Sequence, residues 1–166
     1  KIKQKFSKIK NVVKGGNTRQ DSVYAGLMKI SINTKIVLIH DGVRPFVSEN
    51  KIKKVIIETK KCKACIPAIP IKETIKESTS FQIIKKTLNR NNLWLAQTPQ
   101  SFEKNLIIKA HNKAKAEKII ATDDANLVEK LGKKIKIING DMNNIKITNK
   151  EDLVWARNYL KIKKLF

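Results

Sequence analysis

Residues 35–40, KIVLIH, form a nearly continuous run of apolar, mostly β-branched side chains. An unbroken run of this kind is typical of a strand that is buried on both faces, whereas a half-exposed strand alternates apolar and polar residues. We expect such a strand to be flanked by other strands of a parallel sheet and to be covered by helices. This segment therefore favours an α/β fold.

The rest of the chain alternates between helix-like and strand-like patterns. Apolar side chains recur at helical spacing between residues 23 and 30, after Asn17 and Thr18, either of which suits an N-cap. The predicted helices cover residues 19–30, 48–61, 102–118, 123–131 and 150–160, and the predicted strands cover residues 8–13, 35–40, 64–69 and 135–138. This order predicts a Rossmann-like three-layer sandwich with a mostly parallel sheet, whose chemistry lies at the carboxyl ends of the strands.

Residues 71–95 interrupt this order with the short alternating stretches KETIKES, FQIIKKT and NNLWLAQ. The segment is too long for a simple connection in a compact domain. We expect a projecting β-hairpin arm that pairs two subunits. The length of 166 residues is typical of one domain. The arm, residues 71–97, therefore belongs to a single domain of residues 1–166.

The net charge of +22 first suggests a protein that binds nucleic acid. Of the 36 basic residues, however, only Arg19, Arg44, Arg90 and Arg157 are arginines, the side chain that suits phosphates and base edges best. The lysines are spread along the whole chain with many isoleucines and asparagines. A dedicated nucleic-acid partner is therefore not expected, although a Lys-rich module that binds polyanions stays as an alternative.

Cys62 and Cys65 form a lone C-x-x-C, and neither histidine stands at a convincing zinc-ligand spacing from it. We expect reduced, structural thiols. The chain contains no apolar run of the roughly 18 to 20 residues that a membrane span needs. The expected location is the cytoplasm, or the stroma of a plastid-type organelle in a eukaryote, with no membrane partner.

The first motif with chemical meaning is GGNTRQDS, residues 15–22, between a predicted strand and a predicted helix. Paired glycines let the backbone approach a ligand closely, and a helix N-terminus offers unpaired N–H groups to an anion. A tight strand-to-helix turn would explain the same residues. The motif alone leaves both interpretations open.

The second motif is HDGVRP, residues 40–45, directly after the predicted buried strand. Asp41 and Arg44 place a negative and a positive side chain at the carboxyl end of that strand, where Asp41 can hold a divalent cation and Arg44 a phosphate. A surface ion pair worth less than about 1 kcal/mol is the alternative. The position after a buried strand favours a site near Gly16 and Lys146.

Further candidates are scattered over predicted loops, and each taken singly is more often a cap or a turn residue than a ligand. They are Thr74, Arg90, Thr98, Thr122 with Asp123 and Asp124, and Lys146. Together they supply hydroxyl groups and cations, which suits a polar phosphorylated substrate.

The order of these motifs carries a resemblance. GG-x-x-R-Q-D-S, V-L-I-H-D-x-x-R-P, I-P-x-K-E-T, R-x-x-L-W-x-A-Q-T-P-Q, A-T-D-D-A and N-I-K-I-T follow one another between about residues 12 and 160. In sequence and spacing the chain resembles the 2-C-methyl-D-erythritol 4-phosphate cytidylyltransferases of the non-mevalonate isoprenoid pathway. The resemblance implies attack of a substrate phosphate oxygen on the α-phosphorus of CTP, which releases pyrophosphate and needs no protein nucleophile.

The resemblance also implies roles for individual residues. The residues that would bind CTP are Gly16, Asn17, Ser22, Asp41 and Gly42, and Asp41 would also hold Mg²⁺. The residues that would bind the methylerythritol phosphate and the reacting phosphates are Arg44, Thr122 and Lys146, with Arg44 and Lys146 as the catalytic cations. Thr74, Arg90 and Thr98 match substrate-binding residues on or beside the arm, some of which reach the active site of the neighbouring subunit in a homodimer.

Three positions depart from the family pattern: Asn17 stands in place of Asp, Gly42-Val43 in place of two alanines, and Asp124 where Glu is common. Relatives also open with a strand and a Gly-rich loop that carries an Arg and a Lys, and nothing before Gly15 resembles it. The chain is therefore expected to match the C-terminal two-thirds of the family. We expect no appreciable CTP-dependent pyrophosphate release from the chain alone, and recovery when a family-like N-terminal segment is restored. A nucleotidyltransferase with another phosphorylated or sugar acceptor and an inactive remnant stay as alternatives.

Overall fold

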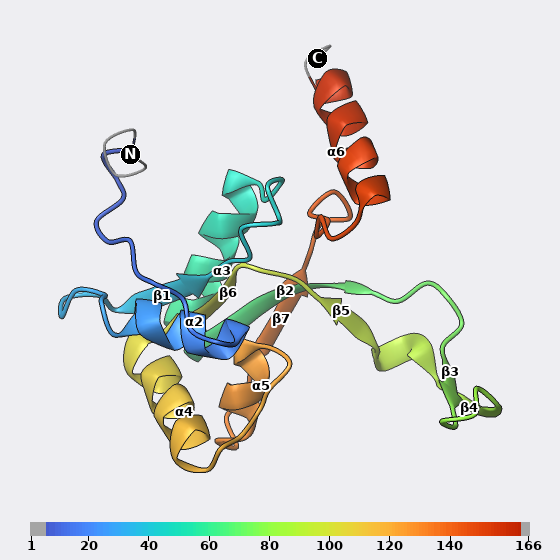
Figure 1. Cartoon of the computed structure of the whole chain (residues 1–166), viewed down its shortest axis with the longest axis horizontal. Coiled ribbons are helices and arrows are strands. Elements are labelled where there is room, and N and C mark those ends of the chain that lie inside the picture. The colour runs from blue at the N-terminus through green and yellow to red at the C-terminus, as the bar shows by residue number, and fades with distance from the viewer. Residues whose placement is uncertain (1–5, 164–166) are drawn as a thin grey trace.

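The computed structural model describes residues 6–163, which form a mixed sheet with helices on both faces (Figure 1). The strands of the sheet are β1 (Ile36–Ile39), β2 (Ala64–Pro70), β5 (Trp94–Ala96), β6 (Gln100–Glu103) and β7 (Lys136–Asn139). The helices are α2 (Arg19–Leu27), α3 (Glu49–Cys62), α4 (Lys104–Ala116), α5 (Asp124–Glu129) and α6 (Lys150–Lys163). The predicted α/β fold is confirmed.

Two apolar cores show how the layers are built. Val37 and Ile39 of β1 pack with Phe102 of β6 against helices α2, α4 and α5. Leu38, which points to the opposite face of β1, packs with Val55 of α3 and with β2 and β7. Successive residues of one strand thus pack against different helical layers, which explains why residues 36–39 form an unbroken apolar run.

The expected mostly parallel pairing is wrong. Among the described strands, β2 pairs in parallel with β7, but it pairs antiparallel with β5 and β6, and β6 also pairs antiparallel with β1. The reason is that β6 lies between β1 and β2 and runs against both, although β1, β2 and β7 share one direction. In the described part of the chain β1 therefore lies at an edge, paired only with β6, and is not flanked by parallel strands as expected.

Side-chain caps fix where the helices begin. Thr18 and Asp21 form a capping box at the start of α2, because the Thr18 side chain accepts from the Asp21 N–H while the Asp21 carboxylate accepts from the Thr18 N–H. Ser48 caps α3 and Asp123 caps α5 in the simpler one-sided way. These starts agree with the sequence-based predictions to within one residue.

Two predicted elements need correction. Residues 8–13 form no strand, since a strand needs a partner and none of the described strands pairs with them. The helix expected from residue 102 begins at Lys104 instead, because residues 100–103 form β6. Phe102 thus enters the core from a strand, and its side chain is fully buried.

The arm leaves the body of the molecule after β2 and returns as β5 (Figure 1). Its tip is the predicted hairpin, made of β3 (Lys76–Ser78) and β4 (Ile84–Thr87), which pair with each other and with no other described strand. A short 3₁₀ turn, η1 (Arg90–Asn92), precedes β5. Phe81, Ile83 and Ile84 near the tip are all more than 60% exposed.

Helix α6 stands apart from the sheet (Figure 1). Its aromatic rings pack against Phe46 in the loop after β1. Trp155 and Tyr159 stack on each other with centroids 4.9 Å apart, and both meet Phe46 edge-on. Neither α6 nor any other described helix is long and apolar enough to cross a membrane.

Phe102 should carry a large part of the stability of the main core. We expect Phe102→Ala to lower the free energy of unfolding by about 3 to 5 kcal/mol, because a fully buried ring is replaced by a cavity. Phe81→Ala is the matched control, since Phe81 is 84% exposed, and should change the value by less than about 0.5 kcal/mol. Urea unfolding followed by circular dichroism measures both. Equal effects of the two substitutions would contradict the packing.

Candidate active site

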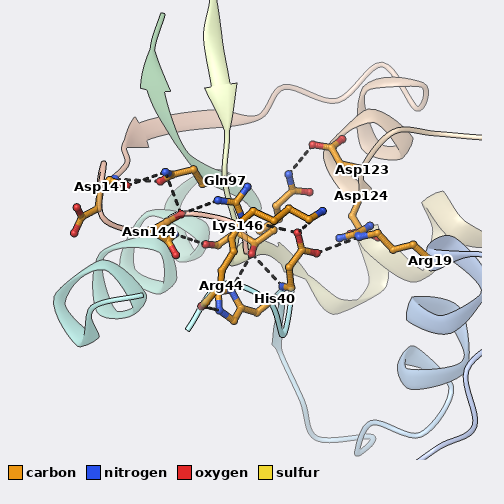
Figure 2. A network of polar contacts seen from close by, with 12 residues as sticks. Arg19, His40, Arg44, Gln97, Asp123, Asp124, Asp141, Asn144 and Lys146 are labelled. Atoms are coloured by element: carbon orange, nitrogen blue, oxygen red, sulfur yellow. Dashed lines mark hydrogen bonds and ion pairs between the residues drawn. The ribbon is translucent and has the colours of Figure 1, made fainter. Parts of the chain in front are cut away.

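A hollow of about 290 Å³ opens at the carboxyl end of β1, where the loops after β1, β5 and β7 meet α2 and the start of α5. Figure 2 shows the polar side chains around it. The lining residues are Arg19, Asp41, Arg44, Ala96, Gln97, Thr98, Gln100, Thr122, Asp123 and Lys146. We call this hollow the Asp41 site. Six of the residues proposed from sequence meet there: Asp41, Arg44, Thr98, Thr122, Asp123 and Lys146.

Asp41 is the carboxylate at the centre of the site. Its Oδ2 lies 3.3 Å from Nζ of Lys146 and 3.8 Å from Nε of Arg44, and its Oδ1 lies 3.2 Å from Nε of Arg19. Partial burial alone would raise the pKa of Asp41, but Arg19 and Lys146 more than offset this and hold the pKa below its usual value. The carboxylate is therefore ionised at neutral pH.

Arg44 is held by the loop that follows β7. Its Nη1 donates to the backbone oxygen of Asn144 at 2.7 Å, and the backbone N–H of Ile147 donates to the oxygen of Val43 at 2.9 Å. These bonds bring the loop of Lys146 against the loop of Asp41. Two segments about a hundred residues apart in sequence thereby form one wall of the site.

Thr98 and His40 fix the backbone of Asp41. The Asp41 N–H donates to Oγ1 of Thr98 at 3.1 Å. His40 lies with Nε2 3.0 Å from the Arg44 carbonyl, which can only accept, so Nε2 carries a proton. In the neutral imidazole Nδ1 is then the acceptor, and the Thr98 hydroxyl donates to it over 2.9 Å.

Gln97, between β5 and β6, and Gln100, the first residue of β6, hold the neighbouring loops in place. The Gln97 amide donates to the oxygen of Asp141 at 2.8 Å and accepts from its N–H at 3.1 Å. Gly140 is needed there, because a Cβ would lie 2.4 Å from Oε1 of Gln97. Gln100 donates to Oδ2 of Asp123 at 2.6 Å and accepts from the N–H of Ala125.

Arg19, at the start of α2, links the site to a second buried acid. Its Nη2 lies 2.8 Å from Oδ2 of Asp124, whose Oδ1 lies 3.0 Å from Nε2 of His111. Burial would lower the pKa of Arg19, but the two carboxylates, Asp124 foremost, raise it above its usual value. Gln20, the next residue, holds residues 119–121 through both ends of its amide.

The glycine motif forms the turn before α2. The Gly16 N–H donates to Oγ of Ser22 at 3.1 Å, and that hydroxyl donates to the oxygen of Thr18 at 2.9 Å. A Cβ on Gly16 would lie 2.3 Å from Cβ of Asp21, so a side chain does not fit at this position. Asn17 in this turn and Gly42 in the loop after β1 are both exposed. None of these four positions lines the Asp41 site itself, although Arg19 in the same motif does.

Two predicted substrate residues lie outside the hollow. Thr74 and Arg90 are exposed residues of the arm, and Arg90 donates to the backbone oxygen of Lys72 there. Conversely, Arg19, His111, Gln97 and Gln100 belong to the polar network around the site, although no role was predicted for them from the sequence. A polar residue on an apolar helix face, such as His111 between Ile107, Ala110 and Ala114, is the signal that could have revealed part of this network.

The site can hold a divalent cation only with help from a ligand. The described residues bring no group of three His, Cys, Asp or Glu side chains together that could hold a metal ion. Asp41 is a single carboxylate among three cations. Mg²⁺ is commonly held by one or two carboxylates, water and substrate phosphates, so Asp41 fits a magnesium ion that arrives bound to a nucleoside triphosphate.

The chemistry of the site is that of an anion-binding centre. Arg19, Arg44 and Lys146 place three positive charges around one carboxylate, and Thr98 and Thr122 add hydroxyl groups. The described lining residues include no Cys or Ser, and the Thr98 hydroxyl, which donates to His40, also accepts from the Asp41 N–H and so serves to hold the loop. Such a site suits transfer between phosphates, which depends on alignment and charge stabilisation.

Comparison with known proteins decides the family. The model of the family 2-C-methyl-D-erythritol 4-phosphate cytidylyltransferase matches residues 2–162. The chain belongs to this family. The cytidylyltransferase of Alkaliphilus oremlandii is 46% identical over 159 residues, which are 96% of this chain and 67% of the relative. That of Dictyoglomus thermophilum is 46% identical over 164 residues, 96% of this chain and 71% of the relative.

Solved structures agree with this assignment. The 4-diphosphocytidyl-2C-methyl-D-erythritol synthase of Anaerococcus prevotii aligns with a TM-score of 0.89 and 38% identity over 96% of this chain and 71% of that one. The cytidylyltransferase family consists of nucleotidyltransferases that transfer the cytidylyl group of CTP to 2-C-methyl-D-erythritol 4-phosphate in isoprenoid precursor synthesis. This is the function of the chain, which spans about two thirds of the length of the curated relatives.

Thr98 should matter for the stability of the site. We expect Thr98→Val to lower the free energy of unfolding by about 1 to 3 kcal/mol, because the partly buried Asp41 N–H loses its acceptor, the hydroxyl of the buried Thr98. Thr87→Val is the matched control, since Thr87 is exposed on the hairpin, where its hydroxyl accepts from the Lys76 ammonium group. Chemical unfolding compares the two, and a Thr98→Val variant as stable as the control would contradict the proposed role of the hydroxyl.

Proposed function

We propose that the Asp41 site is the centre at which the cytidylyl group passes from CTP to methylerythritol phosphate. The observation that carries this proposal is the meeting of one carboxylate and three cations at the carboxyl end of β1, beside a hollow of about 290 Å³. In sheets of this kind ligands bind outside the carboxyl ends of strands. Asp124 balances Arg19, so Arg44 and Lys146 are the cations that favour the triphosphate and the acceptor phosphate.

Arg44 and Lys146 are the catalytic cations in this proposal. As the acceptor oxygen attacks the α-phosphorus and pyrophosphate leaves, charge accumulates on the phosphoryl oxygens, and preorganised cations stabilise it. The Arg44 side chain is only 13% exposed and is anchored on the Asn144 carbonyl, so its position changes little when the substrates bind. Lys146, 43% exposed, keeps the freedom to follow the reacting phosphate.

The remaining residues bind the two substrates. Asp41 would hold Mg²⁺ together with phosphate oxygens of CTP, where the ion screens the triphosphate charge and polarises the α-phosphate. Gly16, Asn17 and Ser22 at the start of α2, with Gly42 after β1, take the nucleotide. Thr98 and Thr122 place the acceptor next to Arg44 and Lys146. Both substrates are charged and dissolve in water, which favours a location in the cytoplasm.

Residues 71–97 form the dimerisation arm of this single domain in our proposal. Their exposed apolar side chains support it, because three such residues gather at the hairpin: Phe81, Ile83 and Ile84. Thr74 and Arg90 lie on the same arm and, in a homodimer, would reach the active site of the neighbouring subunit. The arm would then complete the site as well as join the subunits.

Substitutions of the charged residues test the site. Asp41→Asn, Arg44→Ala and Lys146→Ala should each lower the rate of CTP-dependent pyrophosphate release by about 10² to 10³, because each removes a group that holds or stabilises the reacting phosphates. The assay contains CTP, Mg²⁺ and methylerythritol phosphate. The substitutions are measured in a longer form that carries the remaining third of a relative, and the chain alone, from which no appreciable release is expected, gives the baseline.

Matched controls separate this effect from the loss of a surface charge. Arg157 on α6 and Lys134 before β7 are exposed and line no part of the Asp41 site. Arg157→Ala and Lys134→Ala should therefore keep the rate within about twofold. Full activity of Asp41→Asn in a folded, active form of the protein would overturn the assignment of the site.

Sedimentation tests the arm. We expect a dimer at micromolar concentration, and we expect Phe81→Asp combined with Ile83→Asp to give a monomer, because burying two carboxylates in an apolar contact is costly. Ile32→Asp is the control, since Ile32 is 88% exposed in the loop before β1, outside the arm. A monomeric unmodified protein, or a dimer that survives both arm substitutions, would contradict the proposed interface.

A further inference from the structure

Arg19 bridges two carboxylates that belong to different layers of the fold (Figure 2). Its Nε lies 3.2 Å from Oδ1 of Asp41 at the edge of the sheet, and its Nη2 lies 2.8 Å from Oδ2 of Asp124 at the start of α5. The Arg19 side chain is 37% exposed, whereas Asp124 is buried, with 1% of its side chain exposed. Arg19 is thus held from its buried end and presents its other edge to the site.

Asp124 is in turn held by His111 of α4. Nε2 of His111 lies 3.0 Å from Oδ1 of Asp124, and each of the two side chains is 1% exposed. The imidazole also stacks against Tyr24 of α2, with ring centroids 6.2 Å apart. The two oxygens of Asp124 therefore face groups from two other helices, Oδ1 in a hydrogen bond with His111 and Oδ2 in an ion pair with Arg19.

We propose that His111, Asp124 and Arg19 form a positioning network that orients Asp41 for the reaction. This inference rests on the proposed function of the Asp41 site. With Arg19 fixed on Oδ1, Arg44 and Lys146 share the other oxygen, Oδ2, and Asp41 cannot turn to take either cation on both oxygens. The charge of Asp124 also balances that of Arg19, so Arg44 and Lys146 stay available for phosphates.

A purely structural salt bridge would explain the Asp124 contacts but not their continuation to Asp41. Packing of α2 on α5 needs only the Arg19–Asp124 pair. The positioning network requires in addition that loss of Asp124 acts on the reaction through Arg19. That requirement separates the two explanations, because effects transmitted through one residue are not additive when that residue is also removed.

The first measurement follows Arg19 directly, in the chain itself. The chain contains only four arginines, so the Nε–Hε region of a ¹⁵N spectrum is simple, and Arg19→Lys identifies the Arg19 signal by its loss. Asp124→Asn should speed exchange of the Arg19 Nε proton with water by about fivefold or more. Glu129→Gln, the same change of charge on an exposed residue of α5, should leave it unchanged. An equally protected Arg19 signal in Asp124→Asn would overturn the proposal.

The second measurement is a double-mutant cycle on pyrophosphate release in the longer form described above. Arg19→Gln and Asp124→Asn should each lower kcat by about tenfold, the size of effect common for groups that orient a site residue. The KM for CTP should change less, and the double variant should be no slower than the slower single one. Additive losses of about a hundredfold, or single variants with unchanged kcat, would overturn the network.

Folding and function are controlled separately. If Asp124→Asn does not fold, His111→Gln takes its place in both measurements, and Arg19→Gln must still lower kcat, since Arg19 is partly exposed and tolerates the change. Asp41→Asn distinguishes failure of the proposed active site from failure of the positioning network. If Asp41→Asn is active, the proposed site fails; if Asp41→Asn is inactive and the other losses are additive, only the network fails.

Discussion

The candidate active site depends on the segment of residues 97–100, which is buried between β5 and β6. Every loop of the Asp41 site is bonded to it. Gln97 holds the loop after β7, Thr98 holds the loop after β1, and Gln100 holds the start of α5. Because buried amides and hydroxyls are costly to leave unpaired, these bonds leave the loops few alternative positions.

The register of β6 against β1 sets this arrangement. Ile39 lies opposite Gln100, and continuing the same antiparallel register brings Asp41 opposite Thr98, where the Asp41 N–H meets the Thr98 hydroxyl. A slip of one residue would turn every side chain of β6 to the other face, and Phe102 would leave the core. The packing of a core phenylalanine and the geometry of the site are thus two results of one strand register.

Charge alone does not distinguish the site in a chain with a net charge of +22. Lysines occur over the whole surface, and pairs such as Lys53 with Glu49 are so exposed that they contribute little. Arg44 differs because it is 13% exposed and anchored on a backbone carbonyl beside a carboxylate. Partial burial strengthens its interaction with an incoming phosphate, since fewer water molecules screen the charge.

The sequence predicted the elements whose signals are local. The apolar run of β1, the Ser48 cap of α3 and the alternating arm could all be read from neighbouring residues. Strand β6 could not, because QSFE is short and mostly polar and its pairing depends on β1 and β2, far away in the sequence. The apolar pair at the end of residues 8–13 led to the prediction of a strand that does not form, since Val12 is 64% exposed and pairs with none of the described strands.

The same distinction holds for the site. Asp41, Arg44 and Lys146 could be proposed from ordered motifs, and the structure places Arg44 and Lys146 each within 4 Å of the Asp41 carboxylate. The apolar face around His111 marks it as a buried polar residue, but its partner, Asp124, could not be predicted because it lies on another helix. A contact between helices that meet only in the folded chain is not encoded in the spacing of either one.

Asp41 is the point where the two layers of the fold meet. Its backbone is fixed from the sheet by Thr98, and its side chain is fixed from the helical layer by Arg19, which α5 and α4 hold in place. A carboxylate oriented from one side only would be free to rotate about its own side-chain bonds. Orientation from both layers means that the dipoles and charges of the site are in position before the substrates arrive, which is the condition under which electrostatic stabilisation is effective. The buried His111–Asp124 pair, far from the solvent, thereby contributes to the geometry of an open site.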